Sequence, residues 1–313
     1  MTNKILVTGG AGNVASAVVQ KLAADRANHI VVADNLLTGF ADRVPTDLEN
    51  VQFIKCDVNE FRDISALFFS FNFDYVFHYA AVVGVQRTLD NPLWVLRDIT
   101  GIENLLKLSK NTGVKRVYYS SSSEVYGEPF EFPQNEDTTP LNSRLPYAVV
   151  KNLGEVYLRT YQREFGLDYT IFRLFNTYGP NQSEDFVLPK FVRAAMRGDD
   201  ITLYGDGSQT RTFCYVDDNV DACLNAHRQG RFVNDTLNIG GAEEISIRDL
   251  AGLVIEVLGS ASKLKHLPPL PEGDMTRRRP DLTKMRQLLG REPVGLEEGI
   301  RRLAAHYQSI GDA

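Results

Sequence analysis

The sequence predicts an α/β protein built on a doubly wound parallel sheet, with a smaller α/β lobe toward the C-terminus. Short apolar runs rich in β-branched residues alternate with helical patterns up to about residue 175. A glycine-rich turn joins the first run to the first helical pattern, and beyond residue 175 the alternation gives way to turns and prolines. Strands that alternate with helices form right-handed crossovers, which place helices on both faces of a parallel sheet.

Each element follows from its local pattern. The strands are almost continuously apolar, as expected when both faces are buried. They are expected at Lys4–Thr8, Ile30–Ala33, Val51–Ile54, Tyr75–His78, Arg116–Ser120 and Asp168–Phe172. Helices are expected at Val14–Ala24, Ile64–Phe69, Leu93–Ser109 and Tyr147–Glu164, and in the later lobe at Leu188–Arg197, Asp217–His227, Ser246–Leu258 and Leu296–Ser309. No long linker separates the lobes, so they should pack around a cleft.

The composition narrows the class of protein. The 313 residues carry 34 Lys and Arg against 40 Asp and Glu, a net charge of −6, and 43% are hydrophobic. These values are typical of a globular chain, and the acidic balance argues against nucleic-acid binding, which needs clustered positive charge. Three scattered cysteines predict neither a disulfide framework nor a metal site. Because no apolar run fits a bilayer and no secretory leader precedes the first strand, we expect a cytoplasmic protein without membrane contacts.

The first turn has the pattern of a dinucleotide site. Gly9 and Gly12 lie between the first strand and the first helix, and Ala15 takes the third small position. Glycines let the backbone approach a pyrophosphate, which then rests on the helix N-terminus. The turn alone is weak evidence, since ordinary strand-to-helix turns share it. Asp34 adds a carboxylate that binds ribose hydroxyls and repels a 2′-phosphate, so the pattern predicts a Rossmann-like domain that prefers NAD to NADP.

A second group of residues predicts acid–base chemistry. Tyr147 and Lys151 are four residues apart on one helix and therefore share a face. An ammonium beside a phenol lowers the pKa of the phenol and suits it to act as a base. This pair alone is common on solvated helix faces, but four serines, 120–123, end the fifth strand. Ligands bind at that edge of such sheets, where a serine hydroxyl can bond the oxygen that the tyrosine deprotonates.

Together these motifs resemble those of the extended short-chain dehydrogenases/reductases, specifically the NAD-dependent nucleotide-sugar epimerase/dehydratase family. The resemblance implies NAD as cofactor and a UDP-, GDP- or dTDP-linked sugar as substrate. It implies an NAD-binding domain over residues 1–175 and a lobe over 176–313 that mainly binds the nucleotide sugar, the two interleaving. The matching segments are Thr8–Gly12, His78–Ala81, Ser121–Gly127, Tyr147 with Lys151, Arg173–Pro180, Gly205–Asp218, and Gly273 and Asp274 with Arg277 and Asp281.

The resemblance also assigns roles. Ser122 assists Tyr147, which takes the proton of the sugar C4 hydroxyl as hydride passes to the nicotinamide, and Lys151 binds the nicotinamide ribose. Asp57 and Val58 are placed to hold the adenine edge, although a strand-ending aspartate can simply close a turn. The cofactor set is Gly9, Gly12, Asn13, Val14, Asp34, Asn35, Asp57, Val58, Ala80, Ala81, Tyr147 and Lys151. The substrate set is Val85, Ser123, Asn176, Arg211 and Arg277, with the arginines on the diphosphate.

The step after C4 oxidation stays open at this point. Return of the hydride gives an epimer. Loss of water gives a 4-keto-6-deoxy sugar, and loss of carbon dioxide gives a pentose. Glu124 is the informative catalytic candidate, because simple 4-epimerases mostly have a small residue there, whereas Ser-Ser-Glu resembles decarboxylases and GDP-mannose 4,6-dehydratases. Ser123 stands where dTDP-glucose dehydratases have aspartate. The alternatives are a GDP-heptose-like 4-dehydrogenase that releases the 4-keto sugar, and an idle NAD-binding protein.

Two residues depart from the usual pattern of this family, and two helices predict how the chain assembles. Asn13 replaces a bulky aromatic residue and Asp98 replaces an asparagine, both near the expected cofactor. The helices Leu93–Ser109 and Tyr147–Glu164 resemble those that pair into a four-helix bundle in this family. Their apolar stripes are wider than one core face needs, so we expect a homodimer.

Overall fold

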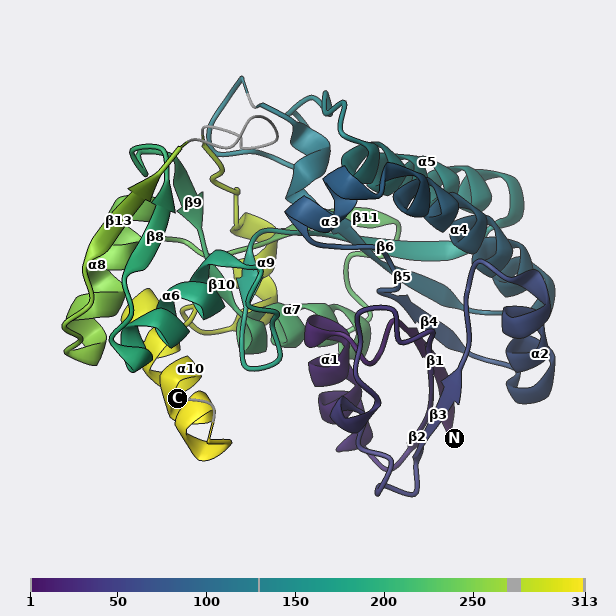
Figure 1. The fold of residues 1–313 in the computed structure, drawn as a ribbon. Coiled ribbons are helices and arrows are strands. Elements are labelled where there is room, and N and C mark those ends of the chain that lie inside the picture. The colour runs from purple at the N-terminus through teal and green to yellow at the C-terminus, as the bar shows by residue number, and fades with distance from the viewer. Residues whose placement is uncertain (1, 129, 269–276, 312–313) are drawn as a thin grey trace.

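The centre of the molecule is a seven-stranded parallel sheet (Figure 1). The computed structural model describes residues 2–128, 130–268 and 277–311. The strand order is β11-β6-β5-β4-β1-β2-β3, so the chain reverses its direction of progress between β1 and β4. The strands are β1 (Asn3–Thr8), β2 (Asn28–Asp34), β3 (Val51–Lys55), β4 (Tyr75–His78), β5 (Arg116–Ser122), β6 (Asp168–Leu174) and β11 (Asp235–Ile239). The doubly wound sheet that the sequence predicts is confirmed.

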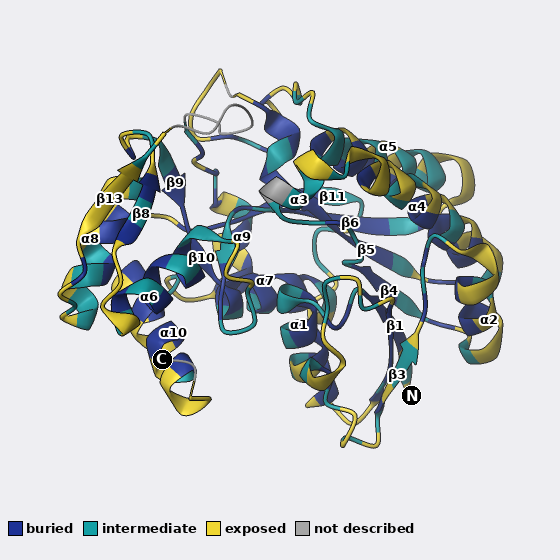
Figure 2. Ribbon diagram, viewed as in Figure 1, coloured by how far each residue is buried: buried dark blue, intermediate teal, exposed yellow. Residues whose placement is uncertain are grey.

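Helices cover both faces of this sheet and bury two separate cores (Figure 2). Ile5 and Val7 face the core under α1 and α7, whereas Leu6 faces the core under α2, α4 and α5. Because side chains alternate across a strand, only a nearly continuous apolar run can fill both cores. The bounds are α1 (Asn13–Ala23), α2 (Phe61–Phe71), α4 (Pro92–Thr112), α5 (Pro146–Phe165) and α7 (Val216–Arg228).

The strand β11 is one that the sequence pattern did not reveal. It comes from beyond residue 175, yet it pairs in parallel with β6, with Asp235 opposite Thr170. Two of its five residues, Thr236 and Asn238, are polar and buried. Polar side chains at alternate positions hide the apolar run that marks the other strands. The later part of the chain therefore supplies an edge strand to the sheet built by the earlier part.

The remaining elements gather mainly at the end of the molecule opposite α2 (Figure 1). Three two-stranded pairs form there and beside the sheet: β8 (Ile201–Tyr204) with β13 (Leu264–Leu267), β9 (Thr210–Thr212) with β12 (Glu244–Ser246), and β7 (Thr177–Tyr178) with β10 (Cys214–Tyr215). The other helices are α3 (Val85–Asp90), α6 (Val187–Arg197), α8 (Ile247–Leu258), α9 (Thr283–Leu289) and α10 (Leu296–Ser309), with short turns η1 (Ala41–Arg43) and η2 (Ser123–Tyr126). All predicted helices are present, with ends shifted by a few residues. Across the described ranges, no helix combines the length and the apolar character needed to cross a membrane.

Candidate active site

A cavity of about 1420 Å³ lies between the carboxyl ends of the main strands and the smaller lobe. The ends of β1, β2, β5 and β6 line one side, and residues of α6, β8 and β9 line the other. Ligands of doubly wound sheets bind at this edge, near the point where the strand order reverses. Sixteen of the predicted site residues line it: Gly9, Gly12, Asn13, Val14, Asp34, Asn35, Asp57, Val58, Ala80, Ala81, Ser122, Ser123, Glu124, Tyr147, Asn176 and Arg211.

The turn after β1 fits a pyrophosphate. Gly9 has a φ of 69°, and a Cβ there would lie 2.6 Å from the backbone nitrogen of Ala80. No side chain caps the N-terminus of α1 at Gly12, so the amide groups that begin this helix are available to an anion. The Oδ1 atom of Asn13 beside them is buried and has no hydrogen-bond partner among the described residues. Close backbone packing and an orphaned polar atom at a helix start match a bound dinucleotide.

Two carboxylates hold fixed positions at the same end of the cavity. Asp34 is buried, and its two oxygens accept hydrogen bonds from the backbone nitrogens of Ala11, at 3.0 Å, and Leu36, at 2.8 Å. Each carboxylate oxygen has further lone pairs, so Asp34 retains acceptors for ribose hydroxyls. Asp57 accepts from Asn35 Nδ2 at 3.4 Å. The two carboxylates predicted to contact ribose and adenine therefore lie at neighbouring strand ends, β2 and β3.

Three catalytic candidates converge from two elements. Ser122 ends β5, and Tyr147 and Lys151 lie in the first turns of α5. Lys151 is buried behind the cavity lining, 5.7 Å from the centre of the Tyr147 ring, and its Nζ donates to the carbonyl oxygen of Ser120 at 2.6 Å. The Ser122 hydroxyl accepts from the backbone nitrogen of Glu124 at 3.2 Å and hydrogen-bonds Tyr147. The geometry places a phenol and a hydroxyl together in the cavity lining, with an ammonium buried behind them.

The surroundings shift the pKa values of these groups. Burial lowers the pKa of Lys151 to about 8, and the negative charge of Asp98 opposes that shift. Burial raises the pKa of Tyr147 well above its usual range, and the charge of Glu124 raises it further, whereas the hydrogen bond with Ser122 lowers it. A phenol so placed becomes a base at neutral pH only when positive charge beyond that of the Lys151 ammonium is brought close to it. A cationic cofactor bound next to Tyr147 would supply that charge.

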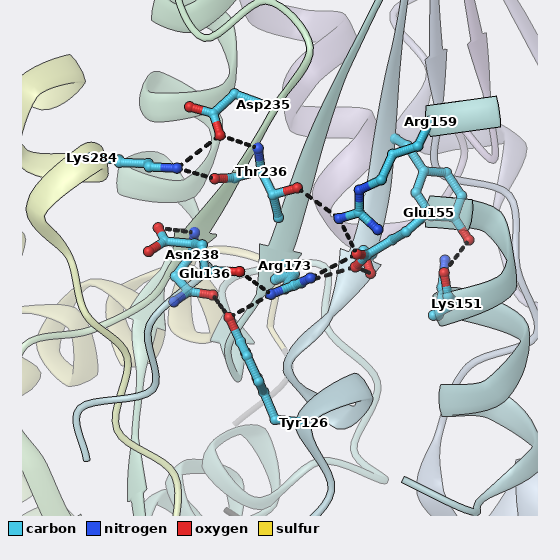
Figure 3. A network of polar contacts seen from close by, with 12 residues as sticks. Tyr126, Glu136, Lys151, Glu155, Arg159, Arg173, Asp235, Thr236, Asn238 and Lys284 are labelled. Carbon is cyan, nitrogen blue, oxygen red and sulfur yellow. Dashed lines mark hydrogen bonds and ion pairs between the residues drawn. The ribbon is translucent and has the colours of Figure 1, made fainter. Parts of the chain in front are cut away.

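A buried polar network lies behind the catalytic candidates (Figure 3). Glu155 of α5 accepts from the Ser121 hydroxyl at 2.6 Å and binds Arg173 of β6 through two hydrogen bonds, at 3.0 Å and 2.8 Å. Arg173 Nη1 donates to the Tyr126 hydroxyl at 2.8 Å, which donates to Asn238 Oδ1 of β11 at 2.8 Å. The network joins β5, α5, β6, η2 and β11, so it fixes the elements that carry the site relative to one another.

Of the consecutive arginines 277–279, the one that lines the cavity is Arg278 rather than Arg277. Arg277 binds Glu244 through Nε at 2.5 Å and Nη2 at 2.8 Å, and in the described part of the chain it does not line the cavity. Arg278 is buried, lines the cavity and donates to Glu124 Oε1 at 2.7 Å. Isolated β-bridges pair Arg277 with Thr210 and Pro280 with Gln134, so this segment is extended. Neighbouring side chains of an extended segment point to opposite sides.

Three other substrate candidates line the cavity, and the side chain of a fourth lies outside the described structure. Asn176 and Arg211 line the cavity, and each donates to a backbone carbonyl of β9. Ser123 is buried in the lining. Val85 begins α3, but its side chain lies outside the described structure, as do Gly273 and Asp274.

Sequence reasoning did not single out several cations of the lining. Arg43 follows β2, and Lys190 and Arg193 lie one turn apart on α6. Their spacing on an amphipathic helix is the one local signal that could have found the last two. Positive groups in the cavity lining suit a ligand that carries phosphates. No group of three His, Cys, Asp or Glu residues placed to hold a metal ion occurs in the ranges that the structure describes.

Known proteins share the whole of this architecture. Residues 5–240 match the model of the NAD dependent epimerase/dehydratase family. The chain is 35% identical to UDP-glucuronic acid decarboxylase 5 of Arabidopsis thaliana, over 95% of this chain and 87% of the relative. The crystal structure of UDP-glucose 4-epimerase with UDP-glucose from Thermotoga maritima superposes with a TM-score of 0.91, at 33% identity, covering 98% of this chain and 99% of that one.

A third relative carries a third reaction. The crystal structure of a dTDP-glucose 4,6-dehydratase from Streptomyces venezuelae, with NAD bound, has a TM-score of 0.89 at 29% identity and covers 98% of this chain and 97% of that one. Decarboxylase, epimerase and dehydratase thus resemble the chain to similar degrees, so similarity identifies the family and not the reaction. The resemblance seen in the sequence motifs is confirmed: the chain belongs to the NAD dependent epimerase/dehydratase family.

Proposed function

We propose that this chain, an NAD-dependent nucleotide-sugar modifying enzyme, oxidises its sugar at C4 with Tyr147 as the base. The observation that carries the assignment is that Ser122 and Tyr147 meet in the cavity lining, with Lys151 buried directly behind them. The C4 hydroxyl gives its proton to the Tyr147 oxygen as the C4–H bond breaks. When bound, NAD accepts the hydride that leaves C4. Ser122 hydrogen-bonds the same hydroxyl, and the Lys151 ammonium stabilises the phenolate.

The nucleotide-diphosphate half of the substrate is proposed to lie against the smaller lobe. Asn176 and Arg211 line that side, and Arg211 is buried. Two phosphates carry a dense negative charge, which a guanidinium binds through charge-assisted hydrogen bonds. Lys190 and Arg193 of α6 add positive charge to the same wall.

Product analysis tests the function. The wild-type enzyme is incubated with UDP-, GDP- and dTDP-sugars, and products are identified by mass spectrometry. An unchanged mass with a new isomer indicates epimerisation. Loss of water indicates dehydration, and loss of carbon dioxide indicates decarboxylation. Loss of two hydrogens indicates a released 4-keto sugar. A chain that neither binds nor alters any of these sugars would be an idle NAD-binding protein instead.

Asp34→Ser is expected to bring the affinities for NAD and NADP closer together. The buried carboxylate lies where a 2′-phosphate would sit, and its charge repels that phosphate. Its removal leaves Arg43 of the same lining able to pair with the phosphate. Calorimetry with both cofactors measures the ratio of the two affinities. The control is Asp42→Asn, which removes the same negative charge at an exposed position. Equal affinities in the wild type would contradict the role of Asp34.

Asp98→Asn is expected to move both limbs of the pH–rate profile toward lower pH. The negative charge of Asp98 raises the pKa of Tyr147, and it raises the pKa of Lys151 against the larger effect of burial. Its removal therefore lowers both pKa values. Asparagine has the same shape and can still accept the 2.8 Å hydrogen bond from the Val82 backbone. Reaction rates measured across pH test this expectation. A profile that does not shift would show that the charge of Asp98 does not affect the pKa of Tyr147 or Lys151.

We also propose that the enzyme is a homodimer joined through α4 and α5. These helices pack on each other and expose apolar side chains, among them Leu93, Leu96, Val149 and Val156. Exposed apolar rows on adjacent helices are typical of a surface that a second copy covers. Light scattering at micromolar concentration should give the mass of two chains, and Val156→Lys should lower it toward one. A wild-type monomer at that concentration would contradict the proposal.

We further propose that the enzyme works in the cytoplasm. Cys56, Cys214 and Cys223 are all buried and free, and thiols persist in a reducing compartment. Fractionation of cells that express the tagged protein tests this location.

A further inference from the structure

One short segment of the chain contacts both sides of the cavity. Residues 181–186 lie between β7 and α6, and all six line the cavity. We call this segment the acidic strap, because Glu184 and Asp185 stand side by side in it. At its start, Asn181 Nδ2 donates to the Ser16 hydroxyl of α1 at 3.3 Å. The strap therefore leads from the helix that begins at the glycine turn to the helix that carries cations of the smaller lobe.

Both acids of the strap bind arginines that line the cavity. Asp185 Oδ2 lies 3.5 Å from Nη2 of Arg87, which belongs to α3. Glu184 Oε1 lies 3.4 Å from Nη1 of Arg193, which belongs to α6. Because the two acids are neighbours in the chain, their Cα atoms are only about 3.8 Å apart. Two guanidinium groups from different elements therefore reach the same short stretch of chain.

The strap holds these arginines loosely. The two separations are longer than the roughly 2.7–2.9 Å of a good hydrogen bond between ionised groups. The side chains of Glu184 and Asp185 are 60% and 62% exposed, and water weakens ion pairs at such positions. The Ser183 hydroxyl also donates to Asp185 at 3.0 Å, so this carboxylate keeps a partner when the arginine leaves it. Both pairs can therefore be exchanged at little cost in free energy.

A diphosphate group is well suited to replace the two acids. Its two phosphates carry about the same negative charge as two carboxylates, and phosphate oxygens bind guanidinium groups through short, paired hydrogen bonds. Arg87 donates from Nη1 to the carbonyl oxygen of Val83 at 2.8 Å, which holds its side chain in the lining. This bond uses only one of the five N–H donors of the guanidinium group. A diphosphate can therefore offer Arg87 stronger contacts than the strap does.

We propose that the acidic strap occupies Arg87 and Arg193 in the free enzyme, and that the diphosphate of the nucleotide sugar displaces Glu184 and Asp185 from them. This inference rests on the proposed function, which supplies the diphosphate and places it beside α6. It adds Arg87 of α3 to the residues that bind the substrate. It also makes the strap a built-in competitor, so that only a ligand with enough negative charge gains both arginines.

Removal of a competitor should tighten binding. Asp185→Asn and Glu184→Gln each keep the shape of the side chain and remove its charge. Calorimetry with UDP, GDP and dTDP identifies the nucleotide that binds, and each variant should bind it about two- to fivefold more tightly than the wild type. Arg87→Gln should weaken the same binding. Asp200→Asn removes an equal charge at an exposed position outside the described cavity lining and should leave the affinity unchanged.

A double variant separates competition from general repulsion. Any negative charge near an anionic ligand weakens binding through space, whether or not it pairs with an arginine. If Asp185 competes for Arg87, adding Asp185→Asn to Arg87→Gln should not tighten binding, because the group competed for is already gone. If the gain persists in the Arg87→Gln background, the effect is general repulsion and the inference is overturned. Circular dichroism verifies that each variant is folded.

The remaining outcomes separate the inference from the proposed function. A wild-type enzyme that binds a nucleotide diphosphate, with folded Asp185 and Glu184 variants that bind it no more tightly, would overturn the inference. A gain confined to NAD, measured in parallel, would place the competition at the cofactor and would also overturn it. Failure of the wild-type enzyme to bind UDP, GDP and dTDP would instead refute the proposed function.

Discussion

Tyr147→Phe is expected to lower turnover by about 10²–10⁴-fold while the affinity for the nucleotide sugar stays nearly unchanged. The substitution removes only the hydroxyl that takes the C4 proton. The half-buried ring packs against the core on the Lys151 side of the cavity, and phenylalanine keeps its shape, so packing should be preserved. NADH absorbance in a single turnover with an accepted substrate measures the loss, and calorimetry measures the affinity.

A matched control separates chemistry from general damage to the helix. Tyr161→Phe removes the same atom from the same helix, α5, at a half-buried position away from the cavity lining. It should leave the rate close to that of the wild type. If Tyr147→Phe reduced NAD as fast as this control, Tyr147 would have no part in the proton transfer.

Local sequence patterns were enough to predict most of the fold. Strands such as Ile30–Ala33 are apolar at every position because helices cover both faces of the sheet. β11 was not predicted because Thr236 and Asn238 interrupt its apolar run. Their partners lie far along the chain: Asn238 binds Tyr126, and Thr236 binds Arg159. Such polar positions become favourable only after distant segments have met, and no local pattern records that.

Like the fold, the site has some residues that local patterns predict and others whose positions depend on contacts with distant segments. The glycine turn and the Tyr147–Lys151 spacing are local, and the structure brings Gly9, Asp34 and Tyr147 to one cavity. The choice between Arg277 and Arg278 depends instead on pairing of their segment with residues more than fifty positions away. Three consecutive arginines carry no local mark that shows which one turns inward. Functional side chains on extended segments are therefore harder to predict than those on helices.

The buried network behind the site explains a further part of the local sequence. Lys151 and Glu155 are four residues apart on α5, so the helix that carries the base also carries the acid that fixes it to β6. Ser121, which binds Glu155, immediately precedes Ser122. One carboxylate thus holds both the strand end that carries Ser122 and the helix that carries the proposed base, so its loss should lower both stability and rate.

Glu155→Gln is expected to lower the free energy of unfolding by about 3–5 kcal/mol, because it leaves the buried Arg173 guanidinium without a counter-charge. Glu155 is fully buried, and Arg173 is 2% exposed. Urea unfolding at neutral pH measures the change. Glu164→Gln breaks a solvent-exposed ion pair with Arg163 on the same helix and should cost no more than about 1 kcal/mol.

The double variant Glu155→Gln with Arg173→Met tests the cause. If the cost of the single change comes from an unpaired charge, removing that charge as well should make the double variant less unstable than the sum of its parts. Additive losses would mean that packing, and not charge, holds the elements together. The pH dependence supplies a second criterion, since only the wild type carries an ionisable group at this position.

The sign of that dependence follows from the pKa of Glu155. Burial alone would raise this pKa, but the hydrogen bonds and charge of Arg173 lower it by more than burial raises it. The pKa in the folded state therefore lies below that in the unfolded state. The stabilisation is therefore complete above the unfolded pKa of about 4.3 and is lost as pH falls through the folded value. The stability gap between wild type and Glu155→Gln should narrow in acid. A gap that stays constant from neutral pH into this range would show that Glu155 does not stabilise the site through its charge.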